Sequence, residues 1–172
     1  TKLTYITTNG KLLASALLLN GWQRIRRVEG NHSRAISSQI TYKPSAKITL
    51  NWSTFIGNDK ADSVRKTRYF HNLYGIFKLG RQAGLIIGFD LGAEQKFSGS
   101  HDFNIWYSPV AVLNYKVSDK INLASRIEYY QDDKGVIIST QTLKGIKLWG
   151  FSTNIDYQLL RNLLVRIEAK NY

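Results

Sequence analysis

The chain has 172 residues, a formal net charge of +12 and no cysteine, and 43% of its residues are hydrophobic. This length is enough for one domain with its own core, and the lack of cysteine excludes disulfides and thiolate-ligated metal sites. The charge would suit a nucleic-acid partner in a soluble protein, but the basic residues are spread along the chain, and no uncharged apolar run reaches the roughly 18 residues that a membrane-spanning helix needs.

Apolar residues recur at every second position through much of the chain, and the spacing of three and four that is typical of helices is rare. Alternate side chains of a β-strand point to opposite faces, so this period predicts strands. In chain order, the predicted strands cover residues 2–8, 11–21, 33–43, 46–56, 68–79, 82–95, 102–116, 119–131, 146–158 and 161–171. We therefore expect an all-β protein.

The predicted strands have one apolar and one polar face. In the strand at 146–158, for example, Phe151 and Tyr157 alternate with Ser152 and Asp156. Any half-exposed antiparallel sheet shows this pattern, so it does not distinguish a soluble fold from a membrane fold.

Short and long connections alternate between the predicted strands. Short turns are expected at Asn9-Gly10, Pro44-Ser45, Gly80-Arg81, Ser118-Asp119 and Leu160-Arg161. The connections between them are longer and cover residues 22–32, 57–67, 96–101 and 132–145. Outer-membrane barrels alternate short periplasmic turns with long extracellular loops, whereas a soluble sandwich has no reason to do so. We therefore predict a transmembrane antiparallel up-and-down β-barrel.

Aromatic residues mark both edges of the expected apolar band. Strands that run from a long loop to a short turn end in an aromatic residue on their apolar face, and three of them also begin with one. Eight residues of tilted strand cover about 20 Å of the membrane normal, close to the ~25 Å band of outer-membrane barrels. A general preference of aromatic residues for strands does not explain this constant spacing. The expected membrane-interface girdle is Tyr42, Tyr69, Phe77, Tyr107, Tyr115, Trp149 and Tyr157.

The direction of the strands places both chain ends on the extracellular side, whereas bacterial barrels usually keep their termini in the periplasm. We therefore expect residues 1–172 to be a single β-barrel domain that is incomplete at both ends. The natural barrel is expected to have about twelve or more strands.

Charged residues on the polar faces are predicted to face the lumen, because a charge that faces lipid at mid-depth costs about 2–4 kcal/mol. Arg126 with Glu128, and Arg166 with Glu168, are spaced by two and share a face. They could create a transverse field that orients solutes, or they could brace neighbouring strands by cross-strand pairing. The candidate pore-lining residues are Asp90, Glu94, Arg126, Glu128, Asp156, Arg166 and Glu168.

Catalytic and metal-binding motifs are not apparent. His32, His71 and His101 are isolated, whereas zinc needs several convergent ligands. The acidic loops at 58–62 and 131–135 lack the EF-hand spacing, and each contains a lysine. Because no nucleophile elbow or pair of acids is recognisable either, we predict no enzymatic activity, no metal and no cofactor.

Two segments are the most distinctive, Asn20-Gly21-Trp22 within residues 19–25 and Arg126-Ile127-Glu128-Tyr129-Tyr130-Gln131-Asp132. Further segments follow in order at residues 39–44, 55–58, 68–74 and 166–169. Together they resemble the β-barrel porins of the porin-2, OmpL-like group, found mainly in Bacteroidetes, over almost the whole chain. The resemblance implies an outer-membrane barrel and supports the expectation of further strands, but it carries over no catalytic residue.

The sequence therefore predicts a porin-like channel in the bacterial outer membrane that passes small hydrophilic solutes by passive diffusion. Its expected partners are outer-membrane lipid, lipopolysaccharide and these solutes, with other outer-membrane or periplasmic proteins as further candidates and no nucleic acid. The basic excess could favour anions, although loop lysines could account for most of it. The alternative function is a non-conducting barrel that acts as a structural or assembly subunit of a larger outer-membrane complex. A soluble basic β-sheet protein that binds nucleic acid or polysaccharide is a third interpretation, and the sorted loop lengths argue against it.

Overall fold

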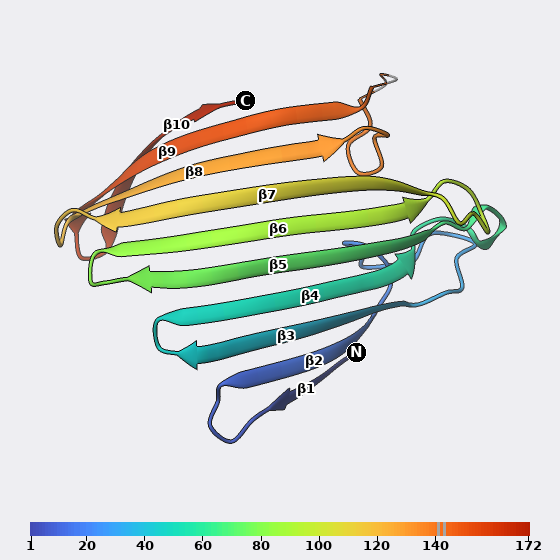
Figure 1. Cartoon of the computed structure of the whole chain (residues 1–172), viewed down its shortest axis with the longest axis horizontal. Coiled ribbons are helices and arrows are strands. Elements are labelled where there is room, and N and C mark those ends of the chain that lie inside the picture. Colours follow the sequence, from blue (N-terminus) through green and yellow to red (C-terminus); the bar gives the residue numbers. More distant parts are fainter. Residues whose placement is uncertain (141, 143) are drawn as a thin grey trace.

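The computed structural model describes residues 1–140, 142 and 144–172, and it contains one ten-stranded sheet with a short 3₁₀ helix, η1 (Asp62–Val64). Each of the ten expected strands is present, with ends shifted by a few residues (Figure 1). The strands are β1 (Lys2–Ile6), β2 (Leu12–Leu19), β3 (Ala35–Ser45), β4 (Ile48–Asn58), β5 (Thr67–Leu79), β6 (Ala83–Gln95), β7 (Phe103–Lys116), β8 (Ile121–Asp132), β9 (Ile146–Leu160) and β10 (Leu163–Asn171).

The strands follow one another across the sheet in chain order, and each neighbouring pair is antiparallel. This arrangement confirms the up-and-down topology. The five short connections allow only antiparallel hairpins, because a parallel crossover needs about a dozen or more residues. No helix in the described part of the chain is long and apolar enough to cross a membrane.

The predicted turn at Pro44-Ser45 is wrong by two residues. Both residues belong to β3, the turn is at residues 46–47, and the register shifts between Tyr42 and Ser45. Proline lacks the N–H that a regular ladder needs, but a register irregularity near a strand end tolerates it. The sequence signal therefore marked an irregular strand end instead of the turn itself.

The sorted connections are present in the structure. The short ones are residues 7–11, 46–47, 80–82, 117–120 and 161–162, and the long ones are 20–34, 59–66, 96–102 and 133–145. Positions 141 and 143 of the expected loop 132–145 lie outside the described residues. All short connections lie at one end of the strands, which we call the short-turn end, and all long ones lie at the long-loop end (Figure 1).

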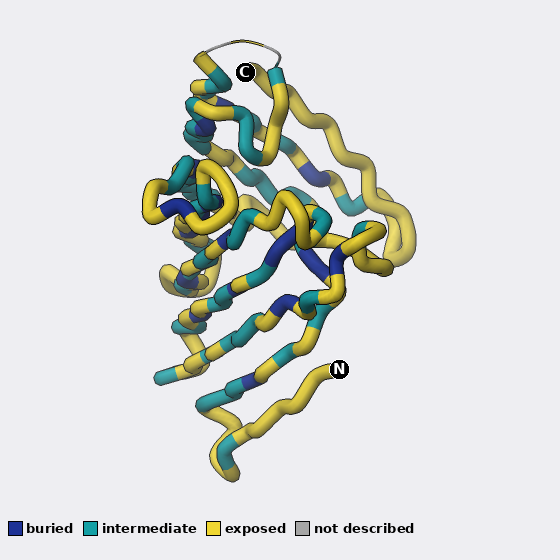
Figure 2. The backbone as a smooth tube through the Cα atoms, turned by 90° about the vertical axis from the view of Figure 1, so that its right-hand side faces the viewer, coloured by how far each residue is buried: buried dark blue, intermediate teal, exposed yellow. Residues whose placement is uncertain are grey.

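The sheet is strongly curved and open in this structure (Figure 2). Among the described strands, contacts join only neighbours in the sheet, so β1 and β10 do not meet. The expectation of about twelve or more strands stays a prediction.

Burial in this sheet is the reverse of that in a soluble protein. Within the described residues, the buried hydrophobic side chains are only Ala35, Phe55 and Trp106, whereas buried polar or charged ones are more numerous and include Asn51 and Asp156. Large apolar side chains such as Ile167, 71% exposed, cover the outer face of the sheet. A water-soluble sheet places its apolar face in a core, and here that face is uncovered.

Candidate functional site

The strand register places all seven candidate pore-lining residues on one face of the sheet. Residues that pair across strands share a face, and the pairs Asp156↔Arg166 and Arg126↔Ser152 are of this kind. The same register extends through β7 and β6 to Asp90 and Glu94. We call this surface the inner face.

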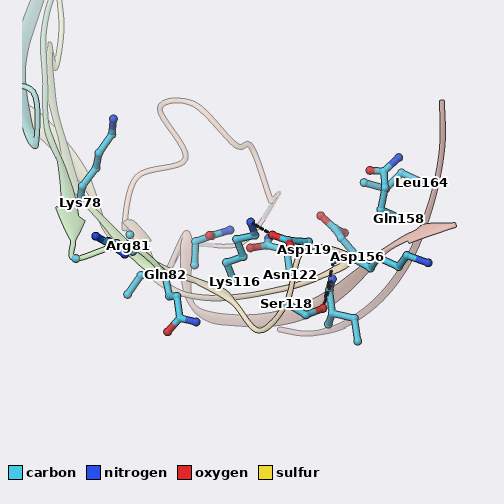
Figure 3. A pocket seen from close by; sticks show the side chains of 16 residues that line it. Lys78, Arg81, Gln82, Lys116, Ser118, Asp119, Asn122, Asp156, Gln158 and Leu164 are labelled. Carbon is cyan, nitrogen blue, oxygen red and sulfur yellow. Dashed lines mark hydrogen bonds and ion pairs between the residues drawn. The ribbon is translucent and has the colours of Figure 1, made fainter. Parts of the chain in front are cut away.

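A pocket shows which side of the sheet is concave. It has a volume of about 410 Å³, lies at the short-turn end and is lined by inner-face side chains from β5 to β10, among them Lys78, Asn114, Asn122 and Asp156. One pocket can be bounded by so many neighbouring strands only on the hollow side of a curved sheet. Figure 3 shows Lys78, Asn122 and Asp156 on the inner side of the bent ribbon.

All seven candidate girdle residues lie on the opposite, outer face, as the pairs Tyr42↔Leu50, Phe77↔Leu85 and Tyr115↔Leu123 illustrate. Towards the long-loop end, aromatic side chains form a nearly continuous row. Its centroid separations are 6.3 Å for Phe89–Tyr107, 6.0 Å for Tyr107–Tyr129 and 4.9 Å for Tyr129–Trp149. Sequence reasoning missed Tyr129, although the pairing of β8 with β9 places it directly beside Trp149.

Charged residues of the inner face are paired with one another. The guanidinium of Arg166 donates to both carboxylate oxygens of Asp156, at 2.6 and 2.7 Å, and so joins β10 to β9. Arg126 forms an ion pair with Glu128 on its own strand. Asn72 donates to Asp90 across β5 and β6 at 2.6 Å. Arg166 therefore makes the cross-strand pair that was one of the two expectations, whereas Arg126 pairs with a residue of its own strand.

A second cluster lies on the inner face near the long-loop end and was not anticipated from the sequence. Arg68 donates from Nη1 to Asp59 at 3.0 Å and from Nη2 to Glu94 at 2.6 Å, and all three residues are buried. The guanidinium carbon lies 5.8 Å from the ring centre of Trp22 and 5.7 Å from that of Trp106. The pairing and the two aromatic rings compensate the cost of burying the cation.

The Arg68 cluster attaches loop 20–34 to the inner face. The Trp22 ring makes edge contacts with Phe55 at 5.1 Å and Phe70 at 4.5 Å, and its backbone N–H donates to Asp59 at 2.8 Å. Gly21 has φ +140°, and a Cβ there would lie 2.5 Å from a carboxylate oxygen of Asp59. Glycine is needed at this position because of both the backbone conformation and the close approach.

Gly92 provides the space for the cluster on β6. A Cβ at Gly92 would lie within 2.0 Å of the indole of Trp106, which pairs with it from β7.

The sequence did contain a signal for this cluster, because Gly21-Trp22 and Arg68 belong to segments that are distinctive of the resembled family. Nothing local in either segment indicates that they meet.

Loop 20–34 also contacts loop 59–66. Asp62 accepts from the backbone N–H of His32 at 3.1 Å and lies 2.9 Å from the Nδ1 of its ring. The hydrogen bond from the His32 side chain is the largest cause that lowers the pKa of Asp62 below its ordinary value of 3.8. The Asn31 side chain donates to the carbonyl of Asn58 at 2.6 Å. Loop 20–34 is therefore joined by hydrogen bonds both to loop 59–66 and to the end of β4.

Asp132 anchors the loop that follows β8. Its side chain is fully buried, at 0% exposure, and accepts backbone N–H groups of Val136 and Ile137, both at 2.8 Å, and of Ile138 at 3.3 Å. The cost of burying this carboxylate is compensated by its several N–H donors.

Among the residues that the structure describes, no group of three or more histidines and acids is arranged to hold a metal ion.

Comparison with protein families matches residues 1–172 to the model described as "Putative beta-barrel porin-2, OmpL-like". Comparison with curated proteins and with solved structures finds no match. The family match covers the inner face, the outer aromatic row and the Arg68 cluster alike.

Proposed function

Because the chain belongs to the β-barrel porin-2, OmpL-like family, we propose that it forms the wall of an outer-membrane pore through which small hydrophilic solutes diffuse passively. The observation that carries this proposal is the reversed burial of the sheet, with charges on the concave face and uncovered aliphatic and aromatic side chains on the other. A lipid bilayer outside and water inside satisfy both faces at once.

The proposed environment follows from the free energy of each face. Burying apolar area contributes about 25 cal/mol per Å², so an uncovered apolar sheet face favours lipid over water. The aromatic side chains of Tyr107, Tyr129 and Trp149 would lie at the extracellular interface, and Tyr42, Phe77, Tyr115 and Tyr157 at the periplasmic one. Outer-membrane lipid and lipopolysaccharide are therefore the proposed partners of the outer face, and residues 1–172 contribute to one barrel domain.

The proposed lumen is lined by the seven residues Asp90, Glu94, Arg126, Glu128, Asp156, Arg166 and Glu168. On the inner face of β5 to β10, six basic strand residues are balanced by six acidic ones. Such a wet, neutral lining suits passage of hydrophilic solutes, and it sets up local fields without a net preference for either sign.

Loop 20–34 supplies the proposed constriction. Its Trp22 side chain lies against Phe55, Phe70 and Arg68 on the inner face and therefore occupies space inside the lumen near the extracellular end. A loop held by buried ion pairs and aromatic contacts narrows a pore permanently and does not need to move for solutes to pass.

Conductance of the purified, folded full-length protein in a planar lipid bilayer tests this function. We expect stable single-channel steps, and a larger step for Trp22→Ala because the constriction is reduced. The matched control is Trp149→Ala, which removes an indole from the outer face and should leave step size unchanged. Silence of a correctly folded, membrane-inserted protein would contradict the pore and favour a non-conducting structural or assembly subunit.

A further inference from the structure

We propose that the short-turn end of the inner face contains an anion-binding pocket, formed by Lys78, Arg81, Lys116 and Lys120, for solutes that carry carboxylate or phosphate groups. This inference rests on the proposed pore only for its consequence for transport, and the binding site itself can be measured separately. Four observations support it: the difference in charge between the short-turn end and the rest of the inner face, the pairing of the nearby acids, the chemistry of the lining and the position of the pocket.

Charge is distributed very unevenly between the sheet and its short-turn end. The short connections, taken with two strand residues on either side, contain seven basic residues and one acidic residue, Asp119. Without Lys78 and Lys116, the rest of the inner face of β5 to β10 carries four basic and six acidic residues. The positive potential is therefore concentrated at the short-turn end, and the rest of the inner face contributes no positive charge in excess. The basic members of this set are Lys11, Lys47, Lys78, Arg81, Lys116, Lys120 and Arg161.

The acids near the pocket are already paired. Asp119 accepts from Lys116 at 2.6 Å, and Asp156 is held by two hydrogen bonds from Arg166. Lys78, Arg81 and Lys120 make no ion pair with any residue in the described ranges 1–140, 142 and 144–172. Three cationic groups therefore line a pocket whose carboxylates are engaged elsewhere. Figure 3 shows Lys78 and Arg81 at the pocket and the ion pair of Lys116 with Asp119.

The rest of the lining supplies neutral hydrogen-bonding groups. Side-chain amides of Gln82, Asn114 and Asn122 lie among the cations, and the volume of about 410 Å³ suits a small molecule or an extended anionic group. Amide N–H groups and lysine ammonium groups both donate to carboxylate and phosphate oxygens. The chemistry of the lining therefore selects an anionic, oxygen-rich ligand.

The position of the pocket distinguishes a solute from a lipid headgroup. Lys78, Asn114, Asn122 and Asp156 all belong to the inner face, so the pocket opens to the hollow of the sheet and not to the apolar outer surface. In the proposed orientation, this is the periplasmic mouth of the pore. Because the cations are exposed, the attraction is screened by salt and acts mainly on local concentration and selectivity.

The test compares two triple variants that remove equal charge from the same end. Lys78→Gln/Arg81→Gln/Lys120→Gln removes the pocket cations, and Lys11→Gln/Lys47→Gln/Arg161→Gln removes three basic residues that do not line the pocket. The probe is tripolyphosphate, with calorimetric binding to the detergent-solubilised folded chain as the first measurement. The second is the chloride-to-potassium permeability ratio from bilayer reversal potentials.

We expect the pocket variant to weaken tripolyphosphate binding by about tenfold or more and the control variant by less than about twofold. The permeability ratio should fall by about threefold in the pocket variant only. Equal effects of the two variants, or no binding to the folded wild type, would overturn the pocket. Binding that the pocket variant alone loses, in a protein that does not conduct, would uphold the pocket and reject the pore.

Discussion

The guanidinium carbon of Arg68 lies 5.8 Å from the ring centre of Trp22, although 46 positions separate the two residues along the chain. Arg68 is on β5 and Trp22 is in loop 20–34, so this contact joins a long loop to the inner face of the sheet. Asp59 completes the link, because one of its oxygens accepts from Arg68 and the other from the backbone of Trp22. Loss of any of the three should therefore loosen the same loop.

Replacing Arg68 tests whether the cluster stabilises the fold. In Arg68→Gln, the carboxylates of Asp59 and Glu94 remain buried without their cation, which typically costs about 3–5 kcal/mol. The free energy of unfolding, measured by denaturant titration in lipid or detergent, should fall by about this amount. Arg126→Gln is the matched control: it removes a half-exposed ion pair and should cost less than about 1 kcal/mol. A loss of equal size in both variants would show that the cluster contributes nothing beyond surface electrostatics.

Gly21→Ala tests the attachment of loop 20–34 from the backbone side. The added methyl would approach a carboxylate oxygen of Asp59 to 2.5 Å, in a backbone conformation that alanine rarely adopts. Gly99→Ala is the comparison, because Gly99 also has a positive φ, +75°, but a Cβ there would meet nothing within 4 Å. We expect about 1 kcal/mol of destabilisation for Gly99→Ala and at least about twice that for Gly21→Ala. Similar losses would mean that the close approach to Asp59 is unimportant.

The fold could be predicted from the sequence because its determinants are local. Alternation along one strand, turn residues such as Asn9-Gly10 and the lengths of connections each need only a few neighbouring residues. The predicted strand ends were less accurate where the register of the ladder shifts, as at Pro44. A proline can indicate either a turn or a tolerated break in the ladder, and the sequence does not distinguish the two. Alternation also assigned Arg126 and Tyr157 to opposite faces, because a strand side chain has only two directions available.

The Arg68 cluster could not be predicted in the same way. It brings together Trp22, Asp59, Glu94 and Trp106, which come from two loops and two strands, and no periodicity connects them. The strand pairing of Arg68 with Glu94 was implicit in the hairpin of β5 and β6 once its register was known. The inward course of loop 20–34 was not, because the direction of a long loop depends on contacts far away in the sequence.

Asp132→Asn is expected to loosen the loop after β8. The amide that replaces one carboxylate oxygen would present N–H groups to backbone donors, and hydrogen bonds to a charged group are worth about 1.5–3 kcal/mol each. Hydrogen exchange of the backbone amides of Val136 and Ile137 should accelerate by about tenfold or more. Asp102→Asn, in a neighbouring long loop with an exposed carboxylate, should leave these amides unchanged. Unaltered exchange in Asp132→Asn would show that other contacts hold the loop.

The contact between His32 and Asp62 should make the link between the two long loops sensitive to acid. A carboxylate whose pKa is lowered in the folded state stabilises that state above its ordinary pKa of 3.8, and this contribution is lost as pH falls through the lower native value. His32→Ala removes the largest cause of the shift, so the Asp62 titration should move up towards 3.8. Carbon NMR of the Asp62 carboxyl, with Asp62→Asn to assign the signal, measures this midpoint. An unchanged midpoint in His32→Ala would contradict the contact.

Adjacent residues on β5 provide the most direct test of which face meets lipid. Leu73 lies on the outer face, midway between the aromatic residues Tyr69 and Phe77, whereas Asn72 lies on the inner face beside Asp90. Leu73→Arg would place a cation at mid-depth in hydrocarbon and should reduce the free energy of unfolding in lipid vesicles by about 2–4 kcal/mol. Asn72→Arg adds the same group next to Asp90, where water and a carboxylate compensate it, and should cost less than about 1 kcal/mol. If the two substitutions cost the same, or if Asn72→Arg costs more, the concave face cannot be the wet one, and the proposed pore would have to be abandoned.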